Sequence, residues 1–309
     1  TAIEPGSDYA LSVYAKTREA SDIIPAGHEV AREQFILAAK DLASQPLAEA
    51  KAKIEKNGNN WVAEAAGVVM TFDGNTGELR GYSVDGRKVI SRPMTPSFWR
   101  APTDNDFGNG FPARSNVWRT ASQNRTLVSF GREGNSLKAV YRLQEVPSDY
   151  VVTYTPLADG SLRVDVAWKA DKGAYKPELG RFGMLITLPR QFDNFAWYGR
   201  GPQENYSDRH TAAFMGRYTG KVADMRWHYV RPQESGNHTD VREATLTDAS
   251  GLGLEVRGLQ PLEVSALDVQ PSALDPGLAK HQQHDSDISP DLDNVYLYVD
   301  LTQRGLGGD

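Results

Sequence analysis

The feature that most constrains this chain is a two-residue alternation of apolar and polar side chains from about residue 61 onward. It is clear in residues 137–144, 162–168 and 252–257. Such alternation is typical of β-strands that bury one face. Dipeptides that favour tight hairpin turns punctuate the region, namely Asp73-Gly74, Asp85-Gly86 and Asp159-Gly160. Many strands with very little helix predict an all-β fold, a large antiparallel sandwich over residues 61–309.

Two further strand-like stretches come earlier, from Tyr9 to Tyr14 and around Val30 to Leu37. Two or three strands cannot bury a hydrophobic face by themselves. We therefore expect residues 1–45 to be the tail of another β-sandwich, or an arm on the main domain. Residues 46–60 are expected to link the two parts. Leu42–Lys56 suits a helix or a linker, and Asn57–Asn60 is a cluster of turn residues.

Only one helix is expected in the sandwich region. Asp275 is placed to cap it, Pro276 fits its first turn, and Leu278–Gln283 continue it. A strand from Val295 to Leu301 comes next. The last five residues, Gly305–Asp309, contain three glycines and are expected to fray.

Composition excludes several classes of function. With 34 Lys plus Arg and 40 Asp plus Glu, the net charge is −6, and no basic block suits nucleic acid or an anionic membrane. There is no cysteine, so disulfides and thiol catalysis are excluded. No apolar run reaches the ~18–20 residues that span a bilayer. The first residues, Thr1–Gly6, lack the features of a signal peptide. The compartment stays open between a bacterial cytoplasm and periplasm.

Three polar segments interrupt the strand pattern, and the first runs from Phe98 to Gly108. Its candidate site residues are Trp99, Arg100, Asp104, Asn105 and Asp106. Such side chains suit hydrogen bonds to sugar hydroxyls. In loops, however, Asp and Asn more often satisfy the local backbone within a polar network. A cation between the two aspartates is the least favoured alternative, because two carboxylates alone rarely form a metal site.

The second segment runs from Trp197 to Arg209 and is typical of a shaped pocket wall. Its candidates are Trp197, Tyr198, Arg200, Gln203, Glu204, Asn205, Tyr206, Asp208 and Arg209. Glu204 and Asp208 are the best acid–base candidates of the chain. An arginine lies close to each in sequence, however, and an ion pair keeps a carboxylate charged instead of raising its pKa.

The third segment, Trp227–His238, contributes the candidates Glu234, Asn237 and His238. Its two histidines stand ten residues apart without further ligands nearby, which argues against zinc. Its aromatic side chains suit either stacking on a sugar ring or packing in the core or at an interface, and such packing is the commoner use. The sequence also lacks the motifs of nucleophile elbows, phosphate loops and dinucleotide sites. We therefore assign no catalytic residue and no metal ligand.

Four motifs occur in the order seen in long family 2 β-galactosidases. They are RAPTDNDFG (Arg100–Gly108), WYGRGPQENYSDR (Trp197–Arg209), YVRPQESGNHTDVR (Tyr229–Arg242) and GLGGD (Gly305–Asp309). AGHEVAREQF (Ala26–Phe35) resembles the end of the immunoglobulin-like domain that precedes the last domain of that family. The resemblance covers nearly the whole chain. It implies a β-supersandwich similar to galactose mutarotases, preceded by the last strands of an immunoglobulin-like β-sandwich.

The resemblance also implies an activity, the retaining hydrolysis of terminal β-galactosides by two glutamates. Both glutamates belong to the family's (β/α)₈ barrel, whose βα pattern is absent here. Any Mg or Na that the parent enzyme uses would lie on that barrel, so no cofactor is expected in this chain. The expected partners are the barrel and the preceding domains of the same polypeptide. The expected role is to pack on the barrel and shape the sugar pocket.

In the family, a Trp shortly after a GGDDSW-like run stacks on the sugar. This sequence stops at Asp309, within that run, so we expect only weak binding of β-galactosides, if any. Two alternatives remain, an autonomous carbohydrate-binding module and, less favoured, an aldose epimerase of the mutarotase type. The epimerase would need one of His210, His228 and His238 opposite a carboxylate.

Function-bearing loops gather at the ends of sandwiches. We therefore expect five side chains to meet at one end and to pair mostly with each other, with Arg209 or with backbone. They are Arg100, Asp104, Asp106, Glu204 and Asp208. The sequence leaves open the preferred linkage and the oligomeric state.

Overall fold

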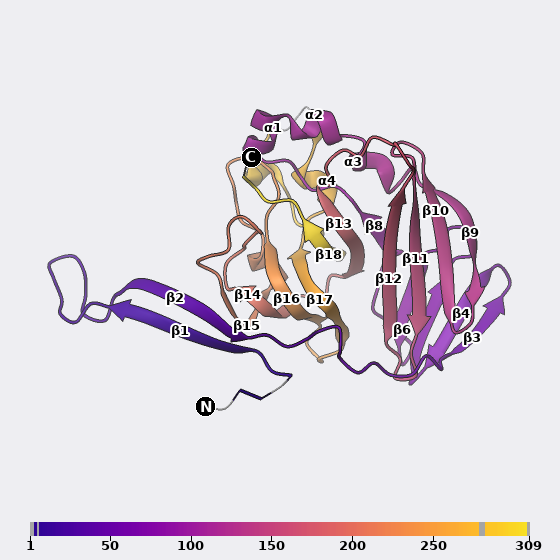
Figure 1. The fold of residues 1–309 in the computed structure, drawn as a ribbon, viewed down its shortest axis with the longest axis horizontal. Coiled ribbons are helices and arrows are strands. Elements are labelled where there is room, and N and C mark those ends of the chain that lie inside the picture. The colour runs from indigo at the N-terminus through magenta and orange to yellow at the C-terminus, as the bar shows by residue number, and fades with distance from the viewer. Residues whose placement is uncertain (1–2, 5, 278–281, 308–309) are drawn as a thin grey trace.

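The computed structural model describes residues 3–4, 6–277 and 282–307. Within these residues the strands form four antiparallel sheets, of two, four, five and seven strands (Figure 1). The all-β antiparallel architecture expected from the alternation is confirmed. No helix in these residues is long and apolar enough to cross a membrane.

The five-stranded sheet is a simple meander in which each strand pairs with the next. Its strands, in spatial order, are β3 (Lys53–Asn57), β4 (Asn60–Ala65), β5 (Val68–Phe72), β6 (Leu79–Val84) and β7 (Arg87–Lys88). Asp85 and Gly86 join the last two strands, with φ angles of 47° and 76°. Two positive φ angles are what a type I′ turn requires, so Asp85-Gly86 makes the hairpin expected of it.

The second half of the stretch expected to be a linker, residues 46–60, forms strand structure. Strand β3 begins at Lys53, and the turn cluster Asn57–Asn60 connects β3 to β4 inside the sheet. The described residues of Leu42–Lys56 contain no helix. Ile54, 6% exposed, anchors β3 in the core and is the physical reason for the difference. The division of the whole chain into domains stays a prediction.

The four-stranded sheet shows the predicted alternation most clearly. Its strands are β9 (Thr126–Glu133), β10 (Ser136–Leu143), β11 (Ser148–Pro156) and β12 (Leu162–Ala170), in the spatial order β12-β11-β10-β9. Every second residue of β10 is buried, from Leu137 to Leu143. These side chains share a hydrophobic core with Met70 and Phe72 of the five-stranded sheet. The two meanders are therefore the two layers of one sandwich.

The seven-stranded sheet brings together segments that are far apart in the sequence. Its strands are β8 (Thr95–Ser97), β13 (Arg181–Pro189), β14 (Asn194–Gly201), β15 (Phe214–Lys221), β16 (Asn237–Thr247), β17 (Gly253–Leu267) and β18 (Asn294–Gln303). The spatial order is β15-β14-β16-β17-β18-β13-β8. A second core covers this sheet, and Tyr82, Val84 and Ile186 pack against both cores. The predicted strand Val295–Leu301 is confirmed as part of β18.

The two expected N-terminal strands form a hairpin that extends away from the rest of the molecule (Figure 1). They are β1 (Tyr9–Lys16) and β2 (Glu29–Ala38). Large apolar side chains on them stay exposed, including Leu11, Val13 and Phe35. The hairpin is tied to the body by Gln34, whose side chain bonds to the backbone of Met215 at 2.7 and 3.1 Å.

Helices are short and gather at one end of the molecule (Figure 1). They are α1 (Asp104–Asn109), α2 (Phe111–Ser115), α3 (Trp118–Ala121) and α4 (Pro271–Leu274). Helix α4 ends before Asp275, where the expected helix was to start, and Gly277 and Gln282 of that prediction have 3-10 helical backbone. Residues 278–281 of that prediction lie outside the described residues.

Helix α1 lies within the first polar segment, which was expected to be a loop. Thr103 and Asp106 form a reciprocal cap: the Asp106 backbone N–H donates to the Thr103 hydroxyl, and the Thr103 backbone N–H donates to the Asp106 carboxylate. A Thr followed three residues later by an acidic residue is a signal for a helix start. This signal was present in the sequence.

Candidate functional site

The three polar segments meet at one end of the seven-stranded sheet, beside the last described residues. The side chain of Asn105 donates to the Leu306 carbonyl at 3.1 Å. Asp208 accepts from the backbone N–H groups of Leu306 and Gly307. Arg231 pairs with Asp104 at 3.3 Å. Segments from four parts of the sequence are thus held together by polar side chains.

A buried ion pair lies at the centre of this end. Arg100 is 1% exposed and Asp106 is fully buried. The guanidinium donates twice to the carboxylate, with N–O distances of 2.6 and 3.1 Å. Arg304 donates to the same carboxylate at 2.9 Å. Arg100 also donates to the Gly305 carbonyl at 2.7 Å, and so connects the start of α1 to the end of the chain.

The expected fraying of Gly305–Asp309 is wrong for residues 305–307. Arg100, Asn105 and Asp208 bond to their backbone groups. These hydrogen bonds offset the entropy that glycines lose on ordering. Asp309, one of the candidate residues, lies outside the described residues, as does residue 308.

Glu204 and Asp208 each accept hydrogen bonds from backbone, and their partners differ. Glu204 accepts from the Gly236 backbone N–H at 2.7 Å, and from Arg209 and the Tyr229 hydroxyl. Although burial alone would raise it, the pKa of Asp208 is lowered because the Gly307 and Leu306 N–H groups bond to its charged form. The contacts of Glu204 and those of Asp208 favour a structural role for both residues.

The two asparagines of the second and third segments are fully buried and fully engaged. The Asn205 side-chain oxygen accepts from the Thr239 backbone N–H at 2.9 Å and from its hydroxyl at 2.6 Å. The Asn205 amide donates to the carbonyls of Arg200 and Gln203. Asn237 donates to the Asn205 carbonyl at 3.0 Å. These amides fix the loop and leave no donor for a sugar.

Two aromatic residues of the second segment, Trp197 and Tyr206, pack inside the protein. Trp197 is 3% exposed and stacks on His238, with ring centroids 4.1 Å apart. Burial lowers the pKa of His238 to about 3, so the ring is neutral. Tyr206 is fully buried. Trp197, Tyr206 and His238 therefore pack in the core, whereas Trp227 of the third segment is 63% exposed.

The remaining candidates lie at the edges of this arrangement. The Tyr198 hydroxyl donates to Asp8 at 2.6 Å, which ties the base of the hairpin to β14. Arg200 pairs with Asp240 at 2.6 Å. The Trp99 indole N–H donates to Asp275 at 2.8 Å. The side chain of Gln203 is exposed.

The contacts connect each of the five side chains expected to meet at one end to the segments gathered there; the five are Arg100, Asp104, Asp106, Glu204 and Asp208. The partners are mainly arginines and backbone groups, since the bond between Arg100 and Asp106 is the single pairing within the set that the described residues show. No cluster of three or more metal-ligating side chains occurs in the described part of the chain. Asp104 and Asp106 are turned to different arginines instead of sharing a cation.

Sequence reasoning missed a second buried charge cluster, which surrounds Arg181. This guanidinium bonds to Glu234 at 3.0 Å and faces Asp300 at 3.4 Å. Burial raises the pKa of Asp300 to about 7, and the neighbouring acids Glu234 and Glu263 add to the effect. The available signal was Asp300 itself, since alternation places it on the same face of β18 as Tyr296 and Tyr298.

Replacing Arg100 with alanine is expected to lower the free energy of unfolding by roughly 1–3 kcal/mol. Asp106 would lose two charge-assisted hydrogen bonds, and the Gly305 carbonyl would lose its donor. Urea unfolding measures the change. The control is Arg163→Ala, because the exposed pair of Arg163 and Asp165 should contribute no more than ~1 kcal/mol. Equal unfolding midpoints for R100A and the parent would show that the network contributes nothing.

Asp300 should make stability depend on pH. Its pKa is higher in the folded than in the unfolded chain, so the folded state binds the proton more tightly. Stability is therefore expected to fall as the pH rises from about 4 to about 7, by on the order of 3 kcal/mol from this group. Asp300→Asn should reduce that slope. Unfolding measured between pH 4 and 8 tests this, and identical slopes for parent and variant would contradict it.

The family described as β-galactosidase small chain matches residues 64–309. A β-galactosidase of Priestia megaterium is 32% identical over 307 residues, covering 98% of this chain and 29% of that protein. A β-galactosidase of Streptococcus thermophilus is 29% identical, again covering 98% of this chain and 29% of that protein. The chain therefore spans less than a third of the length of these curated relatives.

A solved structure from Escherichia coli K12, assigned as an aldose 1-epimerase, covers 81% of this chain and 88% of its own. Its TM-score is 0.39 and its sequence identity is 11%, so it carries no argument about function. The family match is different in kind, because it extends over most of the chain and includes the three polar segments whose contacts are described above. The chain belongs to the β-galactosidase small chain family.

Proposed function

We propose that this chain is the non-catalytic carboxy-terminal part of a β-galactosidase, where it packs on the catalytic barrel and shapes the sugar pocket. One observation carries the proposal. The end of the sandwich that the polar segments build is held from within by buried ion pairs, yet large apolar side chains stand exposed on it. Phe107, Trp227 and Val230 are 38%, 63% and 79% exposed. Exposed apolar groups on a rigid polar frame are typical of a surface that another domain covers.

The hairpin supports a second contact with the same polypeptide. Strands β1 and β2 pair with each other and with no other described strand. Leu11, Val13 and Phe35 are each about half exposed, at 51%, 49% and 52%. Two strands bury too little apolar surface to be stable alone. A preceding immunoglobulin-like domain would cover these side chains and complete its own sandwich.

The contacts of the acidic residues support a non-catalytic role. Retaining glycosidases need two carboxyl groups about 5 Å apart, one of them able to hold a proton. Glu204 is bound by Arg209, Tyr229 and a backbone N–H, and Asp208 has a lowered pKa. Neither is suited to donate a proton to a leaving group.

The epimerase alternative finds little support in the histidines. His238 lies in the core, stacked on Trp197. His228 is exposed and pairs with Asp285 on the surface. An epimerase needs a histidine and a carboxylate on opposite sides of a bound sugar, whereas His228 and Asp285 bond directly to each other.

The chain alone is expected not to hydrolyse a chromogenic β-galactoside, because the two glutamates of the family belong to the barrel. The measurement is release of the chromophore at high enzyme concentration. The opposite result would be turnover approaching a typical ~10 s⁻¹ that disappears in Glu204→Gln. It would place catalysis in this chain.

The packing role can be tested in a chimera, in which this chain replaces the region that it matches in the Priestia megaterium enzyme. We expect the chimera to hydrolyse β-galactosides and Val230→Asp to reduce its activity, since a charge would be buried against the barrel. Val128→Asp is the matched control, because Val128 is a 62% exposed valine on β9, away from the polar end. Equal activities of the two variants would argue against the proposed surface.

A further inference from the structure

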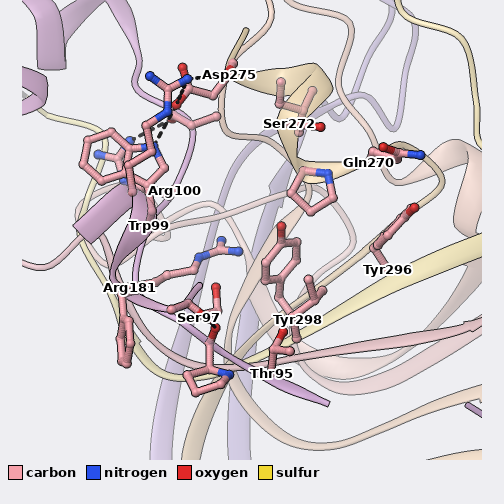
Figure 2. Close-up of a pocket in the computed structure, with 18 of the residues that line it drawn as sticks. Thr95, Ser97, Trp99, Arg100, Arg181, Gln270, Ser272, Asp275, Tyr296 and Tyr298 are labelled. Carbon is pink, nitrogen blue, oxygen red and sulfur yellow. Dashed lines mark hydrogen bonds and ion pairs between the residues drawn. The ribbon is translucent and has the colours of Figure 1, made fainter. Parts of the chain in front are cut away.

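A cavity of about 550 Å³ lies against strands β8, β13 and β18, and Figure 2 shows the side chains that surround it. Arginines and acids both line it, among them Arg92, Arg181, Glu234 and Asp275. A lining of mixed charge selects no single class of ligand. The attachment of the N-terminal hairpin is more specific, because its polar side chains bond to particular groups of the seven-stranded sheet.

The hairpin of β1 and β2 has two faces of different chemistry. Cross-strand pairing places Leu11 opposite Phe35, and both side chains are about half exposed. Neighbouring side chains point to opposite faces of a strand, so Ser12 and its partner Gln34 lie on the other face. That second face contacts the body of the protein, whereas the apolar first face is largely exposed.

Gln34 binds the body through both ends of its side-chain amide. The Met215 backbone N–H donates to its Oε1 at 2.7 Å, and its Nε2 donates to the Met215 carbonyl at 3.1 Å. The same Nε2 donates to the Ser12 hydroxyl at 3.2 Å, which orients the amide. Met215 belongs to β15, the terminal strand on its side of the seven-stranded sheet. A neighbouring antiparallel strand would exchange two such hydrogen bonds with one residue, so Gln34 takes the place of that strand.

Arg32 extends this contact toward the tip of the hairpin. Its guanidinium donates to the Ala212 carbonyl at 2.9 Å and lies over the Phe214 ring, 5.1 Å from the centroid. Tyr14, its cross-strand partner, packs against the same ring with the two centroids 6.1 Å apart. Both strands of the hairpin therefore contact the start of β15.

A second anchor lies at the base of the hairpin. The Asp8 carboxylate accepts from the Tyr198 hydroxyl at 2.6 Å and from the Lys40 backbone N–H at 2.7 Å, and Arg242 lies 3.7 Å away. Asp8 precedes β1 and Lys40 follows β2, so one carboxylate holds both ends of the hairpin against β14 and β16. Burial acts to raise the pKa of Asp8, but these hydrogen bonds and the charge of Arg242 lower it, so the carboxylate is charged.

Two separated anchors fix a direction, whereas a single anchor would act as a hinge. We propose that Asp8 and Gln34 form a two-point latch, which fixes the hairpin at one angle to the seven-stranded sheet and presents its apolar face to the preceding domain of the same polypeptide. The identity of that domain rests on the proposed function. The latch itself does not, because all of its contacts lie within this chain.

Distance measurements between spin labels test the latch. The sequence has no cysteine, so labels attached at Ile23→Cys and Val128→Cys report one distance. Ile23 is 89% exposed at the hairpin tip, and Val128 is 62% exposed on β9. We expect a single narrow distance distribution for the doubly labelled chain. Gln34→Ala and Asp8→Ala should each replace it with a broad one, because the hairpin then swings about the remaining anchor.

Gln203→Ala is the matched control, because the Gln203 side chain is exposed and forms no hydrogen bond within the described residues. It should keep the narrow distribution. Hydrogen exchange adds a local measurement. Protection of the Met215 amide should fall roughly three- to tenfold in Gln34→Ala, the effect of losing one hydrogen bond, while the amides paired between β1 and β2 keep their protection.

Three outcomes would overturn the proposal. They are a broad distribution in the parent, a narrow distribution in either anchor variant, and loss of the pairing between β1 and β2 in those variants. The last outcome would mean that the anchors keep the hairpin folded instead of fixing its direction. None of these results depends on catalysis by the chimera, so the latch and the proposed function can fail separately.

Discussion

The bidentate ion pair between Arg100 and Asp106 is the constraint on which the polar end of the structure depends. An uncompensated charge in a protein interior is costly, so each of these residues requires the other. Arg100 additionally holds the Gly305 carbonyl, and Asp106 additionally caps α1 and binds Arg304. A single buried pair thus fixes a helix, a strand end and the last described residues. The loops that carry Glu204 and Asp208 are positioned against this assembly.

The strand content and the hairpin turns could be predicted because they depend on local chemistry. Alternation of apolar and polar residues in β10 indicates which face of the strand is buried. Asp85-Gly86 indicates a turn that needs two positive φ angles. The end of the chain could not be predicted in the same way. Gly305 and its neighbours look unconstrained in sequence, and the acceptor that orders their N–H groups, Asp208, lies about a hundred residues away.

In the candidate site, too, some features could be predicted from local sequence and others depended on distant partners. The polar segments were identifiable because their composition breaks the strand pattern, and the charges of their arginines and acids indicated pairing. Sequence alone did not reveal which aromatics would be buried: Trp197 packs in the core, whereas Trp227 is exposed. Nor did it reveal that Arg181 would sit between Glu234 and Asp300, since alternation indicates that a side chain points inward without indicating its partner.

The sheet topology has a consequence for the order in which the chain acquires structure. The four- and five-stranded sheets are meanders, so every pairing in them joins neighbours in sequence and requires only short loops to close. The seven-stranded sheet joins Ser97 to Gly183, and Arg181 to Gln303, across loops of about 90 and 120 residues. Closing long loops is slower because entropy is lost before contacts compensate it. During synthesis the meanders can therefore form early. The edge of β13 that pairs with β18 stays without hydrogen-bonding partners until β18 has been made. A nascent chain of this family would be most vulnerable to misassociation in that interval.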